Sequence, residues 1–221
     1  MSRILPILFN TNMVRAILDG RKTVTRRIAK GIVNWNDNDI YWNVFQRGEW
    51  TGPIEKDVAI KMKAPYSTDS ILYVRETYAW EACWDCGMDI GNGCLKKQAQ
   101  FYNADKGDYG CYIYRASYED NVYPSSGTWH PSIHMPKKAA RIWLKVTDVR
   151  VERLQDITED QAEMEGCGEY QTEAKFSVSP RCHFYEVWES TIKASDKKRY
   201  GWEANPFVWV IEFERCEKPS C

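Results

Sequence analysis

The chain has 221 residues, of which 43% are hydrophobic and 28% charged, a balance typical of a soluble globular protein. Its formal net charge of -1 excludes binding to nucleic acid through overall positive charge, so any affinity for phosphate must come from local clusters. The N-terminal apolar run is interrupted by Pro6 and is too short for a secretory signal or a membrane span. We therefore expect a cytoplasmic protein with no membrane association.

The first part of the chain predicts one helix followed by strands. Met13, Val14, Ile17 and Leu18 recur at helical spacing between N-cap candidates at 10–12 and Gly20, which suits a C-terminal cap. Residues 23–28 alternate and are rich in β-branched side chains, which favours a strand. The polar and aromatic residues 30–56 predict a loop or hairpin. Residues 57–63 and 70–76 alternate and predict two half-buried strands.

The second part predicts a long strand, two helices and a final strand. Residues 141–154 alternate over their whole length. Thr158 and Gln161 form a capping-box pattern for a short helix that stops at Gly166. Residues 184–192 have the spacing of an amphipathic helix, and the apolar run at 206–213 favours a strand.

These elements predict an α+β protein that is mostly β. A small closed or nearly closed β-barrel with flanking helices accommodates them better than a βαβ arrangement does. Residues 78–136 break the pattern, because they hold four cysteines and show little periodicity. We expect a single domain over residues 1–221 with an insertion at about 78–136.

A dense basic cluster follows Gly20. Residues 21–27 include Arg21, Lys22, Arg26 and Arg27 together with two threonines. This pattern fits a solvated charge run, a strand that grips phosphate, or the edge of a catalytic pocket.

Four segments carry a resemblance to a known family. They are "LDGRKTVTRRI", "LYVRETY", "PSIHMPKKAARIWLKVTDVRVERLQDITEDQAEMEG" and "WEANPFVWVIEF", in the expected order. Together they resemble phage and prophage members of the ASCH-domain family. That resemblance implies a PUA-like β-barrel fold and an association with RNA or modified nucleosides.

One branch of that family consists of small amidohydrolases that remove the acetyl group from 4-acetylcytidine. Their catalytic set is a lysine and a threonine in a Gly-Arg-Lys-Thr-x-Thr segment, plus a glutamate after the long strand. The resemblance places these roles on Lys22, Thr25 and Glu165. A threonine needs a base to become nucleophilic, and a lysine can be that base only when it is neutral. Because strand residues alternate between faces, the assignment requires Lys22 to lie in the turn after Gly20.

Further contacts with substrate or nucleic acid are expected around this set. They involve Arg21, Arg26 and Arg27 beside it, Arg75 and Glu76 at a predicted strand end, and Ser132 and His134 in a proline-bounded loop. Arg75 could bind a carboxylate or phosphate, or pair with Glu76 or Glu165. The loop could line the ligand groove of a PUA-like fold or simply be rigid.

The cysteines raise a separate question. Cys83 and Cys86 form a C-x-x-C pair, with Cys94 and Cys111 further along. Four such residues fit a structural zinc site, or they are thiols with no metal. No other cofactor is required by the proposed chemistry.

Tryptophans in loops near arginines are typical of surfaces that stack unpaired bases. The basic run 197–200 is read as a solvated turn or as a phosphate contact.

The sequence therefore predicts a protein that binds RNA or a modified nucleoside, with an amidohydrolase activity on an acylated base. A reader without turnover, a ribonuclease, and a phage interaction protein with a vestigial pocket stay open as alternatives. The oligomeric state is open as well.

Overall fold

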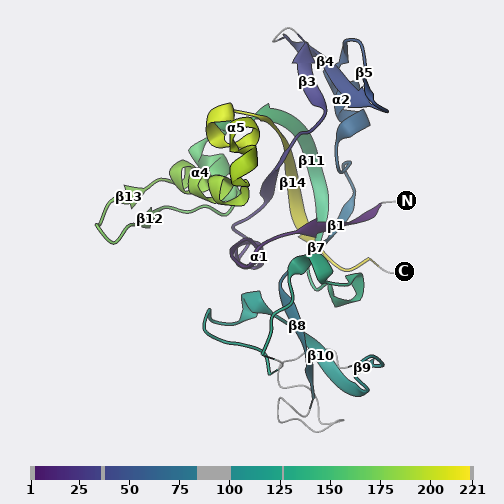
Figure 1. Ribbon diagram of the computed structural model, residues 1–221, viewed down its shortest axis with the longest axis vertical. Helices are drawn as coiled ribbons and strands as arrows, with labels where there is room; N and C mark the ends of the chain where they lie inside the picture. Colours follow the sequence, from purple (N-terminus) through teal and green to yellow (C-terminus); the bar gives the residue numbers. More distant parts are fainter. Residues whose placement is uncertain (1–2, 36–37, 84–100, 126, 220–221) are drawn as a thin grey trace. The chain divides into compact units, whose positions relative to one another are not determined.

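The computed structural model describes residues 3–35, 38–83, 101–125 and 127–219 (Figure 1). With 36% strand, 29% helix and mixed sheets, the chain is an α+β protein, as predicted. It divides into two compact units. Unit 1 comprises Met1–Arg3, Asp19–Ile71 and Leu144–Cys216, and unit 2 comprises Ile4–Leu18, Leu72–Trp143 and Glu217–Cys221.

The central strands of unit 1 were predicted, the first two from alternation and the last, near the C-terminus, from its apolar run. Strand β2 (Val24–Ile28) pairs antiparallel with β14 (Phe207–Cys216), which places Thr25 opposite Ile211. Strand β11 (Trp143–Arg153) borders β14 on its other side. Alternate residues of β2 therefore face opposite sides of this layer.

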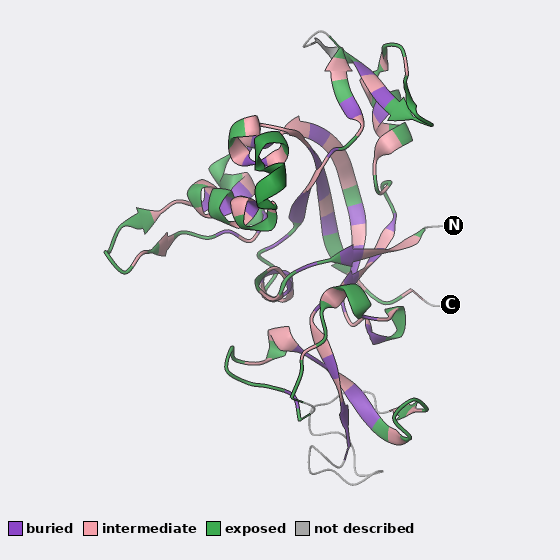
Figure 2. Cartoon of the chain, viewed as in Figure 1, coloured by how far each residue is buried: buried purple, intermediate pink, exposed green. Residues whose placement is uncertain are grey.

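Helices cover one side of β14 and β11 (Figure 1). They are α3 (Glu159–Met164), the predicted amphipathic helix α4 (Pro180–Thr191), and α5 (Lys197–Tyr200). Figure 2 shows buried residues along β14 and on the helices facing it. The core here joins residues of β2 and β14 to the helices, and its larger members are Val24, Val208, Val210, Leu154, Ile157, Phe184 and Trp188. Burying each of these side chains contributes roughly 1.5–3 kcal/mol.

Helix α3 begins and ends as the sequence predicts. The Thr158 side chain accepts from the Gln161 backbone N–H while the Gln161 side chain accepts from the Thr158 backbone, a complete capping box. At the other end Gly166 adopts φ +90°, and the Cys167 N–H donates to the Ala162 carbonyl at 3.1 Å. The left-handed glycine stops the helix and leaves Glu165 as its C-cap.

A small β-meander with a helix completes unit 1. Strands β3 (Ile32–Trp35) and β4 (Asn38–Gln46) form a hairpin, and β5 (Glu49–Trp50) and β6 (Ile54–Glu55) both pair with β4. This agrees with the hairpin expected within 30–56. Strands β12 (Tyr170–Gln171) and β13 (Ser177–Val178) form a short separate pair.

The strand predicted at 57–63 is wrong, because Lys56–Lys63 forms helix α2. Val58 and Met62, which suggested a buried face, are 44% and 41% exposed, and only Ala59 is buried. Asp57 in the first turn and Lys61 in the last turn complement the helix dipole, a signal that favours a helix.

Unit 2 contains two strand groups and a helix. Strand β1 (Ile4–Leu8) neighbours β7 (Ile71–Arg75), and α1 (Thr11–Leu18) is the predicted first helix. Strand β10 (Asp108–Tyr114) pairs with β8 (Tyr78–Ala82) and β9 (Phe101–Asn103). These last three lie in the region predicted to be an insertion.

No sheet in the described part of the chain closes into a barrel, so the predicted barrel is not confirmed. None of the helices within the described ranges combines the length and apolar character needed to cross a lipid bilayer.

Candidate functional site

Lys22 lies in the turn after Gly20, as the catalytic assignment requires. Gly20 adopts φ +76°, and β2 begins only at Val24. The neighbouring Thr23 N–H donates to the Met164 carbonyl at 2.9 Å. This turn is therefore bound directly to the C-terminal end of α3.

The Lys22 side chain meets Glu165 inside unit 1. Nζ donates to Glu165 Oε2 at 2.6 Å, to the Glu165 carbonyl at 2.7 Å and to the Val24 carbonyl at 2.9 Å. The two side chains are 0% and 4% exposed. These three acceptors match the three N–H bonds of an ammonium. One cation thus offsets both a buried carboxylate and the negative end of α3.

Burial lowers the pKa of Lys22, and the charge and hydrogen bond of Glu165 oppose that shift. A proton that moves along the 2.6 Å hydrogen bond from Lys22 to Glu165 converts the ion pair into an amine and a carboxylic acid. Burial thus favours the neutral amine of Lys22, and the contact with Glu165 favours the ammonium.

Arg26 joins the same cluster from β2. Its Nη1 is 3.4 Å from Glu165 Oε1, and its Nη2 donates to Gln161 Oε1 at 2.9 Å. Nη2 is also 3.4 Å from Glu152 Oε2, and the guanidinium lies over the Phe184 ring at 5.9 Å. Buried Nε has no acceptor among the described residues. Arg26 and Lys22 thus hold the Glu165 carboxylate from two sides.

Thr25 occupies the opposite face of β2. Its Oγ1 accepts from Arg27 Nη1 at 2.8 Å, which leaves its own proton for donation. Thr25 is 0% exposed and Arg27 is half-buried. The nucleophile required by the family resemblance is therefore closed to solvent in this conformation.

A pocket of about 350 Å³ in unit 1 lies beside an electrostatic neighbour of Arg27. It is lined in part by Tyr66, a half-buried phenol. Burial raises the pKa of Tyr66 and the Arg27 charge lowers it, so the two groups are electrostatic neighbours. A series of polar interactions thus leads from buried Thr25 through Arg27 to Tyr66, which lines the pocket.

The cluster carries an excess of positive charge. Lys22, Arg26 and Arg27 contribute three cations, against the buried carboxylate of Glu165 and the partly exposed carboxylate of Glu152, which Arg150 also binds at 2.5 Å. Arg21 is different, because its side chain is 53% exposed and pairs with Asp19 at 2.9 Å. Of the four basic residues after Gly20, Arg21 alone fits the solvated interpretation.

The remaining predicted contact residues belong to unit 2. Glu76 is 1% exposed and receives two hydrogen bonds of 2.9 Å from Arg141, a partner that the sequence analysis missed. Arg75 donates to the Ile133 carbonyl. Ser132 and His134 begin and end a 3-10 turn in which His134 is exposed. Glu76 therefore acts as a buried structural partner of Arg141 in this unit.

The predicted zinc ligands are only partly described. Cys86 and Cys94 lie outside the described residues. Cys83 and Cys111 are both buried, and the register of β8 with β10 puts them on one face as diagonal neighbours. Across the described ranges, no three His, Cys, Asp or Glu side chains gather as a metal site. The zinc hypothesis stays a prediction.

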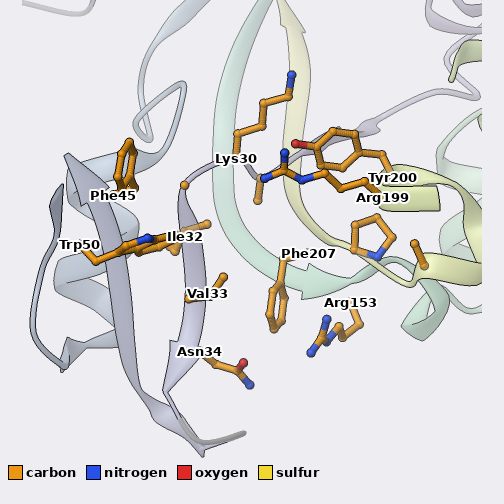
Figure 3. Close-up of a pocket in the computed structure, with 14 residues that line it drawn as sticks. Lys30, Ile32, Val33, Asn34, Phe45, Trp50, Arg153, Arg199, Tyr200 and Phe207 are labelled. Carbon is orange, nitrogen blue, oxygen red and sulfur yellow. The ribbon is translucent and has the colours of Figure 1, made fainter. Parts of the chain in front are cut away.

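A larger pocket of about 630 Å³ opens in unit 1 near the far end of β2 (Figure 3). This pocket was not predicted from the sequence, although loop tryptophans and the basic run 197–200 were noted as possible contacts. The charged and aromatic residues that line it are Lys30, Arg153, Arg199, Phe45, Trp50, Tyr200 and Phe207.

Comparison with known proteins gave no match to a family model, a curated protein or a solved structure. The resemblance stated above therefore rests on the sequence motifs alone.

Proposed function

We propose that this chain is a PUA-like ASCH protein that binds RNA or a modified nucleoside, with a hydrolytic centre at Lys22, Thr25 and Glu165. One observation supports it above the others. The family motif puts Lys22 and Thr25 in one segment and Glu165 in another that is far along the chain. Lys22 Nζ nevertheless lies 2.6 Å from Glu165 Oε2, although 143 positions separate the two residues. Thr25 lies three residues from Lys22 in the chain and is buried as well.

The chemistry would be amide hydrolysis through an acyl-enzyme. Thr25 Oγ1 attacks the acetyl carbon, the C–N bond breaks, and an ester forms on threonine. The threonine proton passes by way of Lys22 and Glu165 to the leaving amine. Water then cleaves the ester, which releases acetate and restores the hydroxyl. Arg27 already donates to Thr25 Oγ1 and would steady negative charge that develops beside it.

This reaction requires the cluster to open. Thr25 is 0% exposed, so the side chains that cover it, Arg27 among them, have to move before a substrate carbonyl reaches Oγ1. Opening also frees Nζ from at least one of its three acceptors.

A reader without turnover is the second candidate. The observation that favours it is the saturation of Lys22 by two carbonyls and a carboxylate, which gives the lysine a structural role at the end of α3. In this version the base is bound and released unchanged.

Incubation of the purified protein with 4-acetylcytidine tests both candidates. Release of acetate and cytidine that is lost in Thr25→Val but kept in Thr25→Ser supports the hydrolase. Binding of the nucleoside without acetate release supports the reader. Turnover that is unchanged in Thr25→Val contradicts the threonine as nucleophile.

A further inference from the structure

The larger pocket of unit 1 combines unpaired cations with aromatic rings. Within the described part of the chain, no carboxylate forms an ion pair with Lys30, Arg153 or Arg199. The described residues that line the pocket include no acid. Three positive charges therefore face a hollow of about 630 Å³ without local neutralisation, a volume within the usual range of small-ligand sites.

One wall of this pocket is held rigidly in place. The Arg153 guanidinium lies over the Phe207 ring at 3.8 Å, and its Nη1 donates to the Asn205 carbonyl at 3.1 Å. Phe207 in turn packs edge-on against buried Trp42, with ring centroids 4.8 Å apart. Figure 3 shows Arg153 and Phe207 together at this wall. A preorganised cation and ring lose little freedom when a ligand binds.

The other side chains are available to a ligand. Lys30 Nζ and Arg199 Cζ lie 5.4 and 5.1 Å from the Tyr200 ring, so two cations gather at one aromatic group. Trp50 is 52% exposed and tilts against Phe45 with centroids 5.4 Å apart. An exposed tryptophan supported by a second ring is a stacking platform.

We infer that this pocket binds a nucleotide. Its phosphate would lie at Lys30 and Arg199, and its base would stack on the aromatic platform formed by Trp50 and Phe45. Basic grooves with stacking rings are how proteins bind single-stranded nucleic acid without reading its sequence. An acidic peptide would use the cations but would leave the rings without a role. The inference rests on the proposed function, since it assigns the binding of an RNA strand to a second place in unit 1.

Binding of a fluorescently labelled ten-uridine RNA tests the pocket, with anisotropy measured from 50 to 300 mM salt. We expect Trp50→Ala to weaken binding roughly 5- to 150-fold, the range for loss of one stacked base. Arg199→Ala should weaken it and lower the slope of log affinity against log salt by about 1. Lys198→Ala is the matched control, because it removes an exposed charge next to Arg199 that does not line the pocket. It should change affinity less than twofold.

Unlabelled uridine monophosphate is the second arm. If uridine monophosphate displaces the RNA at a concentration similar to that at which the RNA binds, the ligand is a free nucleotide. If it does not displace the RNA, the ligand is a strand. Both results support the pocket as a binding site. The inference is overturned if the RNA does not bind at 50 mM salt, or if Lys198→Ala and Arg199→Ala weaken it equally.

The outcome is separable from that of the proposed function. If the protein hydrolyses 4-acetylcytidine but binds RNA equally well with Trp50→Ala or Arg199→Ala, only the inference about the pocket is refuted. If the pocket variants weaken RNA binding but the protein neither binds nor hydrolyses 4-acetylcytidine, only the proposed centre at Lys22 is refuted.

Discussion

Lys22 and Glu165 stand 143 positions apart in the chain, and their side chains form a 2.6 Å ion pair that is almost wholly shielded from water. The same ammonium also donates a hydrogen bond to the Glu165 carbonyl, at the end of α3. The pair therefore joins the segment before β2 to the helix, whatever chemistry it performs.

Breaking this pair from one side should be costly. We expect Lys22→Met to lower the free energy of unfolding by about 3–5 kcal/mol, because it leaves a buried carboxylate without its main partner. Lys22→Met combined with Glu165→Gln should cost clearly less than the two single losses added together. Urea unfolding measures all three. Arg21→Met, which alters an exposed pair, should stay within about 0.5 kcal/mol of wild type. Additive single effects would show that the two side chains are not coupled.

The capping box of α3 should support the site from a distance. Thr158→Ala removes the side-chain acceptor for the Gln161 N–H and should lower stability by about 1 kcal/mol. Thr158→Ser keeps that acceptor and should recover most of the loss. Thermal unfolding compares the two variants. Equal destabilisation by alanine and serine would attribute the effect to the lost methyl group instead.

Cys167 gives a pH dependence whose sign is defined. Burial raises the pKa of this thiol to about 11, against 9.0 as its usual value. Between these values the folded protein keeps a proton that the unfolded chain releases, so this contribution to stability is complete below pH 9 and is lost as pH rises towards 11. The difference in unfolding free energy between wild type and Cys167→Ala should therefore shrink from pH 8.5 to pH 11. A difference that is constant over this range would refute the shift.

The zinc hypothesis makes a stoichiometric prediction. Elemental analysis should find about one zinc per chain, bound by four thiolates as in structural sites. Cys83→Ser and Cys111→Ser should each lose most of it, whereas exposed Cys182→Ser should keep it. A full zinc signal in Cys83→Ser, or no zinc in wild type, would remove the site.

Local chemistry made part of this structure predictable. Thr158 with Gln161 and then Gly166 specify where α3 begins and ends, since each residue satisfies a backbone requirement of its own. Gly20 similarly placed Lys22 in a turn. The proximity of Lys22 and Glu165 could be predicted only from the family resemblance, because no local rule relates residues that are so far apart in the chain.

Other features depended on tertiary partners. Seven alternating residues at 57–63 fitted a strand, yet exposure of Val58 and Met62 shows that the period reflected no buried face. Arg141 was not recognised as the partner of Glu76, since a bidentate pair across 65 positions leaves no local signal. The large pocket likewise collects residues from separate segments whose proximity exists only after folding.

The pairing of β2 with β14 has a consequence for biosynthesis. Ile28 pairs with Val208, 180 positions later. At translation rates of about 5–20 residues per second, β2 leaves the ribosome roughly 9–36 s before its partner. During that interval the strand is an unprotected edge, and the charges of Arg26 and Arg27 discourage it from pairing with another nascent chain. The arginines that surround the buried cluster in the finished protein would thus act earlier as a guard against aggregation.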